Sequence, residues 1–177
     1  TKGLKHLYYI ENLKRKVKDL LIFRKDTEPN FKKDMKLGTS SLRRKMQAKF
    51  HMDATNIEPL NGNIDTRLKK LNDGQYDCII LAEAGLSRLD FLIQNQNYKR
   101  LDHRTCSGQG VLAVQWKEGN AAESIIKSSQ IYKDMTNLNK EINMERELLV
   151  KLNADCNSAI SLLASENYLS GEIYGVE

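Results

Sequence analysis

The sequence predicts an α/β fold with a parallel or mixed sheet and crossover helices, followed by the start of a smaller α+β domain. Between about residues 36 and 92, short apolar runs alternate with helical patterns, which is typical of such a sheet. Two of the predicted helices are preceded by small polar residues and carry arginine in their first turns. The tail from 159 to 176 instead alternates and turns like a β-hairpin, which indicates a change of architecture near residue 155.

The first half of the chain is predicted from short apolar runs. These runs indicate strands at 6–10 and 20–23, and Pro29 with Asn30 marks a turn after them. A third apolar run, at 35–37, leads into a glycine. Apolar residues at 42, 46 and 50 then recur at helical spacing, which predicts a helix over 41–50.

The alternation continues through the middle of the chain. A short strand is predicted at 56–60, and the spacing of Ile64, Leu68 and Leu71 predicts the next helix, which Gly74 is placed to end. The run at 77–82 indicates a buried parallel strand, and 84–89 indicates a short helix. Ligands of such sheets bind where strands end and helices begin.

A second set of elements is predicted after residue 107. A strand is expected at 111–116, followed by helices at about 120–131 and 136–153. The last helix has an apolar stripe formed by Leu138, Ile142, Leu149 and Leu152. No repeat or low-complexity tract interrupts these elements.

Composition excludes several classes. In 177 residues with 40% apolar content, no apolar run approaches the roughly 20 residues of a membrane span. The three cysteines, Cys78, Cys106 and Cys156, form no CxxC pair, which argues against a disulfide framework or zinc site and for reduced thiols. The three histidines are far apart, so no metal site is expected.

Charge is distributed unevenly along the chain. Residues 1–50 hold 15 Lys and Arg against five Asp and Glu, a balance of +10, whereas the whole chain has a net charge of +5. A basic segment of this kind is compatible with nucleic-acid binding, but it is more often a solvated surface. We expect no nucleic acid as partner, because no known nucleic-acid module is visible.

Two segments indicate an anion site. Residues 38–44 read Gly-Thr-Ser-Ser-Leu-Arg-Arg, and residues 61–67 read Asn-Gly-Asn-Ile-Asp-Thr-Arg. The free N–H groups and the positive dipole end of a helix attract anions. Arginine adds a planar fork that binds a carboxylate or phosphate through two hydrogen bonds. Two such arrangements predict a ligand with several negative groups.

These segments resemble, in order and spacing, those of the porphobilinogen deaminase family, also called hydroxymethylbilane synthase. The other matching segments are residues 76–82, residues 84–89, the Gly-Gln-Gly at 108–110 and the Glu-Arg at 145–146 that precedes Cys156. The resemblance spans about residues 19–177. It implies a transferase of tetrapyrrole and heme biosynthesis that joins four porphobilinogen molecules head to tail into hydroxymethylbilane and releases ammonia.

The resemblance also implies a cofactor and a domain plan. The family carries a dipyrromethane primer bonded to one cysteine, here Cys156, and its first two domains resemble periplasmic binding proteins. Residues 1–36 would end the first segment of domain 1, and residues 37–107 would form domain 2. Residues 108–140 would return into domain 1, and 141–177 would begin domain 3. We expect the chain to be the central part of a monomeric protein.

Site residues follow from the same resemblance. Cofactor binding is assigned to Cys156, Thr39, Ser41, Arg43, Arg44, Arg67 and Arg88. Substrate binding is assigned to Arg67, Gly62, Asn63 and Gln109. The alternative without a ligand is that Arg43 and Arg44 form a solvated helix face. Arg67 could likewise pair with Asp65 or Glu58 on the surface.

The chain departs from the family pattern in places. The family usually has arginine at the position of Asn61, and glycines in place of Ala154 and Asp155. Its catalytic aspartate belongs to a His-Ser-x-Lys-Asp motif in domain 1 that none of the Lys-Asp pairs here reproduces. Catalytic residues are therefore unassigned, and the chain alone is expected to be inactive.

Two rival functions remain open. A non-catalytic binding module for a polyanionic small molecule would use the same fold and arginines, and a covalent primer would discriminate against it. A nucleic-acid binder would show a steep, sequence-independent salt dependence. The family implies the cytoplasm or the plastid as the compartment, and no membrane partner is expected.

Overall fold

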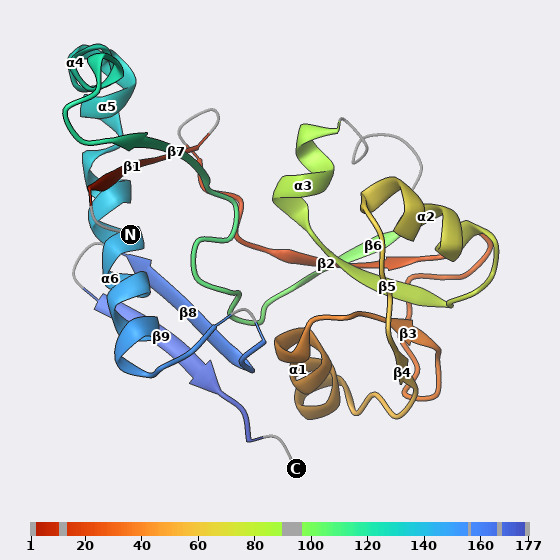
Figure 1. Cartoon of the computed structure of the whole chain (residues 1–177). Helices are drawn as coiled ribbons and strands as arrows, with labels where there is room; N and C mark the ends of the chain where they lie inside the picture. The colour runs from red at the N-terminus through yellow and green to blue at the C-terminus, as the bar shows by residue number, and fades with distance from the viewer. Residues whose placement is uncertain (1–2, 11–13, 90–96, 156, 166–167, 176–177) are drawn as a thin grey trace.

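The computed structural model of the chain describes residues 3–10, 14–89, 97–155, 157–165 and 168–175. Within these residues the strands form one five-stranded sheet and two two-stranded sheets (Figure 1). The strand order of the large sheet is β4-β3-β5-β2-β6. Its bounds are β2 (Asp19–Phe23), β3 (Leu37–Gly38), β4 (Ile57–Glu58), β5 (Cys78–Ala82) and β6 (Tyr98–Leu101).

The large sheet is mixed. Strands β3, β4 and β5 run parallel to one another, whereas β2 pairs antiparallel with both β5 and β6. The prediction of an α/β fold with a parallel or mixed sheet is confirmed. The division into domain segments stays a prediction, and the sheet includes β2 from before residue 37.

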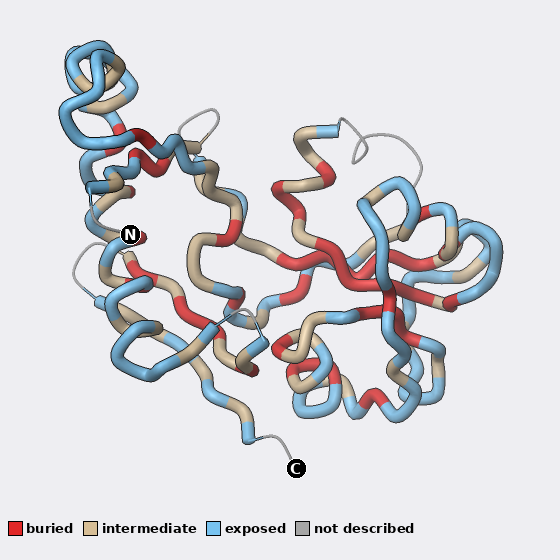
Figure 2. Tube along the Cα trace, in the orientation of Figure 1, coloured by how far each residue is buried: buried red, intermediate tan, exposed pale blue. Residues whose placement is uncertain are grey.

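Helices cover both faces of the large sheet. They are α1 (Leu42–Met52), α2 (Ile64–Asn72) and α3 (Glu83–Arg88). Along β2, Leu20 and Ile22 face the side that holds α2 and α3, whereas Leu21 and Phe23 face the side that holds Ala48 of α1. All five residues of β2 are buried, as a strand covered on both faces requires. Figure 2 shows this burial continuing along β5.

A second core lies under β1 (Leu4–Tyr9), β7 (Leu112–Lys117) and α6 (Thr136–Lys151). Leu7, Trp116 and Ile142 pack there. Strand β1 pairs antiparallel with β7. The hairpin of β8 (Ile160–Ser165) and β9 (Tyr168–Ile173) contacts α6.

Some predicted elements differ in detail. The predicted helix at 120–131 is two short helices, α4 (Ala121–Ser128) and α5 (Gln130–Asp134). Strand β6 was not predicted. The apolar stripe of α6 is buried only in its first half, since Leu138 and Ile142 are buried whereas Leu152 is exposed.

Candidate functional site

Three helices begin at the same edge of the large sheet, because β3, β4 and β5 are parallel and each leads into a helix. Ser41 caps α1, and its Oγ accepts a hydrogen bond of 3.4 Å from the Arg44 N–H. Asn63 caps α2, and its Oδ1 accepts one of 2.8 Å from the Thr66 N–H. Both predicted anion motifs therefore lie at one edge, as the sequence indicated (Figure 1).

Glycine is required at position 62, in the loop before α2. Its φ is +115°, and an added Cβ would lie 2.7 Å from Cγ2 of Thr66. A residue with a side chain would be strained in this backbone conformation, and its Cβ would also collide with the first turn of α2. The loop before α2 therefore depends on glycine at this position.

The arginines of the first motif surround a buried carboxylate. Arg43 Nη1 donates to Asp19 Oδ2 at 2.9 Å, and Arg44 Nη2 donates to Asp19 Oδ1 at 2.7 Å. Burial alone would raise the pKa of Asp19, but Arg44 and Arg43 outweigh it and hold that pKa below its usual 3.8. Asp19 is therefore ionised at neutral pH.

Gln109 joins this cluster from the Gly-Gln-Gly segment. Its Nε2 donates to Asp19 Oδ1 at 3.0 Å and to the carbonyl of Val17 at 2.7 Å. The neighbouring Gly110 has a φ of +83°, and a Cβ there would lie 2.3 Å from the carbonyl oxygen of Lys16. The close crossing of these two backbones is what brings Gln109 to Asp19.

A second buried ion pair fixes the same loop. Glu145 of α6 is fully buried and accepts two hydrogen bonds from Arg15, at 2.7 and 3.1 Å. It also accepts from the backbone N–H groups of Gly108 and Ala164. Glu145 therefore ties the N-terminal segment, the Gly-Gln-Gly loop and β8 to α6.

Three more of the predicted site residues are described by the structure: Arg67, Arg88 and Thr39. Arg67 Nε donates to the carbonyl of Gly62 at 2.7 Å, and burial together with the charge of Arg44 lowers its pKa. No described carboxylate pairs with Arg67 in the structure. Arg88 Nη2 donates to the carbonyl of Gly110 at 3.2 Å. Thr39 is buried, and its Oγ1 accepts from the Ser41 N–H.

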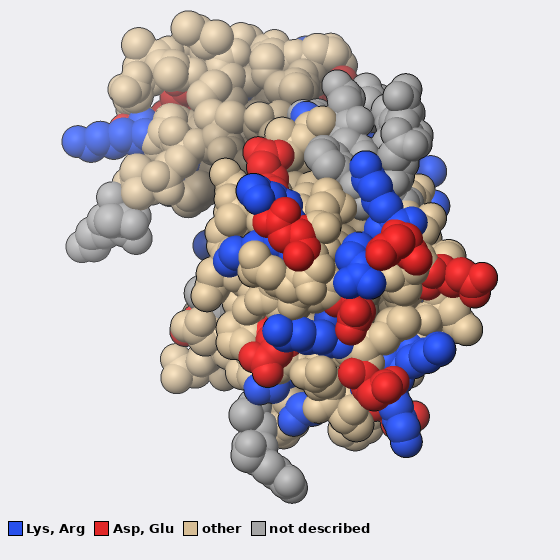
Figure 3. Space-filling view, turned by 90° about the vertical axis from the view of Figure 1, so that its right-hand side faces the viewer, with Lys and Arg blue, Asp and Glu red and all other residues tan. Residues whose placement is uncertain are grey.

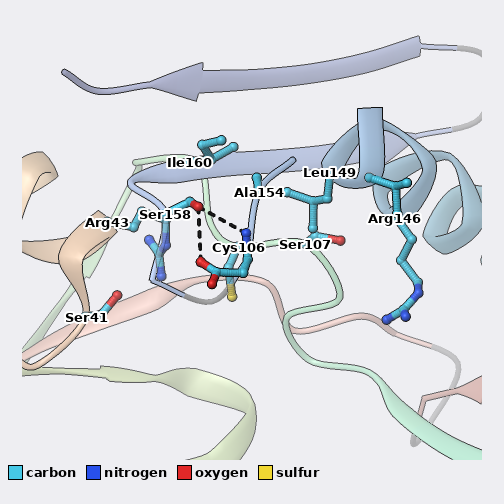
Figure 4. Close-up of a pocket in the computed structure, with 11 residues that line it drawn as sticks. Ser41, Arg43, Cys106, Ser107, Arg146, Leu149, Ala154, Ser158 and Ile160 are labelled. Atoms are coloured by element: carbon cyan, nitrogen blue, oxygen red, sulfur yellow. Dashed lines mark hydrogen bonds between the residues drawn. The ribbon is translucent and has the colours of Figure 1, made fainter. Parts of the chain in front are cut away.

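A pocket of about 410 Å³ lies beside this cluster. Ser41 and Arg43 of the α1 terminus line one side, and Ser107 and Arg146 line another (Figure 4). The pocket also includes Ala154, Asp155 and Ser158, which flank position 156 in sequence. Cys156 itself lies outside the described residues.

Asp155 is held in a local turn at this pocket. Its Oδ1 accepts from the Asn157 N–H at 2.8 Å and from the Ser158 hydroxyl at 3.2 Å. The Asn157 N–H hydrogen bond and the Ser158 hydroxyl lower the pKa of Asp155, the former most, and together they outweigh the opposing effect of desolvation. Position 156 thus has an anion beside it in sequence, which disfavours a thiolate there.

The other two cysteines differ in environment. Cys78 lies on β5 in the core, and burial raises its pKa to about 12, so its thiol is inert. Cys106 is exposed at the pocket, and its Sγ donates to Gln109 Oε1 at 3.3 Å.

Sequence reasoning missed Asp19, Arg15 and Glu145 as members of the site. In the sequence, Glu145 belongs to a motif of the resemblance, and Asp19 belongs to one of the Lys-Asp pairs that lack the family's flanking residues. The available signal was the position of Asp19, directly before the apolar run at 20–23. A carboxylate at the start of a buried strand needs a positive partner, because charged residues are rarely fully buried unless paired.

The comparison that decides the family covers most of the chain. Residues 3–124 match the family model described as "Porphobilinogen deaminase, dipyromethane cofactor binding domain". The chain belongs to the porphobilinogen deaminase family. The matched model is the part of that family that binds the dipyrromethane cofactor, which agrees with the cofactor implied by the sequence motifs.

Curated relatives agree with this assignment. The probable porphobilinogen deaminase of Methanocaldococcus jannaschii is 41% identical over 134 residues, which are 76% of this chain and 42% of that protein. The porphobilinogen deaminase of Streptococcus sanguinis is 38% identical over 167 residues, or 91% of this chain and 53% of that protein. The chain thus spans about half the length of the curated relatives it matches.

Among solved structures, the second substrate binding domain of a putative amino acid ABC transporter from Streptococcus pneumoniae aligns with a TM-score of 0.41 and 14% identity. The alignment covers 81% of this chain and 64% of that one. A likeness this weak carries no argument about function.

Three further observations concern membrane-spanning helices, metal ligands and surface charge. Within the described residues, no helix is long and apolar enough to cross a membrane, and no group of three or more potential ligands is placed to hold a metal ion. On the face in Figure 3, Lys and Arg are interspersed with Asp and Glu. Two of the basic residues in the described chain, Arg24 and Lys69, pair with Asp26 and Asp73.

Proposed function

We propose that the full-length protein is a porphobilinogen deaminase, a transferase that joins four porphobilinogen molecules into hydroxymethylbilane and releases ammonia. This chain would supply its cofactor-binding part. The observation that carries the proposal is the shared edge of the large sheet, where two capped helix N-termini meet Arg44 and Arg67. Membership of the family supports the choice of reaction.

The residues at the pocket fit a carboxylated dipyrromethane. Hydroxyl and guanidinium groups, Ser41 and Arg146 among them, line part of its cavity of about 410 Å³, together with apolar side chains and Asp155. Hydroxyl and guanidinium groups donate hydrogen bonds to carboxylates. We propose that the cofactor is bonded through a thioether to Cys156. The cofactor, when bound, supplies the pyrrole position to which the first substrate is added.

The chain's own residues would bind and orient the growing pyrrole chain. Each porphobilinogen brings an acetate and a propionate, so the charge to be held increases with every addition. Arg44, Arg67 and Arg88, with the N-terminal amides of α1 and α2, would hold these carboxylates. Gly62 and Asn63 would let the backbone approach the substrate. The acid that helps ammonia leave would come from outside this chain.

The experiment is an intact and peptide mass measurement on the full-length protein, purified from cells that make porphobilinogen. A dipyrromethane adduct on the peptide that contains Cys156 supports the proposal. Active enzyme with an unmodified Cys156, or with the adduct on Cys78 or Cys106, contradicts the attachment. The Cys156→Ser variant is the control, because it removes only the thiol.

The alternative is a non-catalytic binding module for a polyanionic small molecule. Asp155 favours it in one respect, because an anion next to position 156 disfavours the thiolate needed for attachment. The same mass measurement separates the two functions, since the module would carry no covalent adduct. The monomeric state and the compartment, cytoplasm or plastid, stay predictions.

A further inference from the structure

Asp19 is a carboxylate buried within the arginine cluster. It begins β2, and only 2% of its surface is exposed. Arg43 and Arg44 of α1 and Gln109 of the Gly-Gln-Gly segment donate to its two oxygens, at 2.9, 2.7 and 3.0 Å, from two segments that are far apart in sequence. Donors that converge on one carboxylate in this way are the arrangement expected of an anion-binding site.

Although Arg43 lines the pocket, both terminal nitrogens of its guanidinium group already have partners within the chain. Its side chain is 4% exposed, and Nη1 also donates to Gln47 Oε1 at 2.7 Å. Its Nη2 contacts Gln109 Oε1 at 3.5 Å. An external carboxylate could therefore reach the position between Arg43 and Arg44 only if Asp19 left it.

Arg67 differs from Arg43 because no described carboxylate pairs with it. It is partly buried beside Arg44, and the repulsion between the two guanidinium groups contributes to its lowered pKa. Asp19 offsets one of the two charges of Arg43 and Arg44, which leaves a balance of +1 before Arg67 is counted. The three arginines and Asp19 thus carry a balance of +2, and among the described residues Arg67 is the arginine of this group that no carboxylate pairs with.

We propose that Asp19 is the built-in occupant of a carboxylate subsite. It fills, from within the chain, the position that one carboxylate of an anionic ligand would take between Arg43 and Arg44. Ligand carboxylates are thereby directed to Arg67 and the outer side of Arg44, and Arg43 serves to hold Asp19. That the ligand is a carboxylated pyrrole rests on the proposed function, whereas the internal occupancy rests on the geometry.

The test is to empty the subsite and refill it with formate, the smallest carboxylate. Asp19→Ala removes the internal carboxylate and leaves the donors of Arg43, Arg44 and Gln109 in place. The melting temperature of the full chain is measured against sodium formate, with sodium chloride at the same ionic strength as reference. The matched control is Asp102→Ala, which removes a carboxylate whose side chain is 95% exposed and pairs with Lys18, the neighbour of Asp19.

The expected result is specific to the emptied subsite. Asp19→Ala should melt below wild type in chloride and regain stability saturably with formate, with an apparent affinity for formate about tenfold or more above that of wild type. In wild type and in Asp102→Ala, formate should change the melting temperature no more than chloride does. Adding Arg43→Leu to Asp19→Ala should abolish the formate response.

An equal response to formate in wild type and Asp19→Ala would overturn the proposal, as would a response in Asp19→Ala no larger than that to chloride. If Asp19→Ala does not fold in chloride, refolding is followed by circular dichroism in each salt. Recovery in formate alone supports the subsite, and failure in both overturns it. Formate is no substrate of the proposed enzyme, so an unmodified Cys156 would leave this result intact.

Discussion

Ser40 Oγ donates a hydrogen bond of 2.8 Å to Asn61 Oδ1, and this bond joins the loop before α1 to the loop before α2. The two anion motifs are therefore in direct contact, and position 61 lies between the two helix N-termini. The family usually has an arginine at this position. An asparagine there gives the edge one fewer positive group for ligand carboxylates.

Replacing Asn61 by arginine should strengthen the binding of carboxylated pyrroles. A charged hydrogen bond contributes about 1.5–3 kcal/mol, so affinity for porphobilinogen should rise about tenfold or more, as measured by calorimetry on the full-length protein. Asn56→Arg is the matched control, because it adds the same charge at the opposite end of β4. Equal affinities in the two variants would show that position 61 does not face the ligand.

Replacing Arg67 by leucine should weaken the same binding by about 1.5–3 kcal/mol. Arg67 lies beside Arg44 without a described carboxylate partner, so its charge is available to a ligand. Arg67→Lys should also bind less tightly, because lysine cannot make the planar two-bond contact. Lys69→Leu, which removes an exposed charge from the same helix, should bind like wild type. Unchanged affinity in Arg67→Leu would mean that this arginine is a surface residue.

Replacing Arg43 by leucine should mainly reduce stability. The change leaves Asp19 buried with one guanidinium partner fewer, and breaking a buried pair costs about 3–5 kcal/mol of unfolding free energy. The double variant Asp19→Leu/Arg43→Leu should recover part of that loss, because no carboxylate is then left buried with a partner missing. The recovery should be incomplete, because Arg44 loses its own hydrogen bond to Asp19. Urea unfolding measures both effects.

Arg24→Leu controls for the removal of an arginine from a more exposed pair, with Asp26. It should unfold at nearly the same urea concentration as wild type. A loss in Arg43→Leu no larger than that in Arg24→Leu would mean that Asp19 does not depend on Arg43.

Stability should fall as the pH drops below about 6.5, the usual pKa of histidine. His103 stacks on His51 with ring centroids 4.5 Å apart. Burial and the charge of His51 lower the pKa of His103, and they outweigh the carboxylates of Glu172, Asp19 and Asp102. The unfolded chain therefore takes up its proton first, so this contribution is complete above pH 6.5 and is lost as the pH falls through the folded pKa.

Thermal melts from pH 8 to pH 5 of wild type and His103→Gln measure this contribution. The variant should show a shallower loss of stability over that range. His6→Gln, which changes a histidine on the exposed side of β1, should keep the wild-type slope. A slope that does not change in His103→Gln would assign the pH dependence to other groups.

Much of the fold follows from local sequence patterns. The starts of α1 and α2 were predictable because Ser41 and Asn63 accept hydrogen bonds from amides only three residues later. Apolar runs likewise predicted β2 and β5, since a strand buried on both faces must be apolar almost throughout. Strand β6 was missed because it carries Lys99 and Arg100 and lies at the edge of the sheet, where β2 is its one partner among the described strands.

The face of α1 that is buried could not be derived from its own sequence. Leu42, Met46 and Phe50 predicted the helix, yet Phe50 is 73% exposed and the buried residues are Arg43, Gln47 and Ala48. Arg43 can be buried only because Asp19 compensates its charge. That partner is 24 residues away and belongs to another element.

The sequence by itself determined the family, the helix caps and the two anion motifs, because these depend on residues close together in the chain. Only the tertiary structure decided how the arginines are used. Antiparallel pairing places β2 beside β5, and the crossing at Gly110 brings Gln109 to Asp19, 90 residues away. A local pattern predicts helix propensity and capping. The partner of a buried arginine, in contrast, depends on which distant segments fold against it.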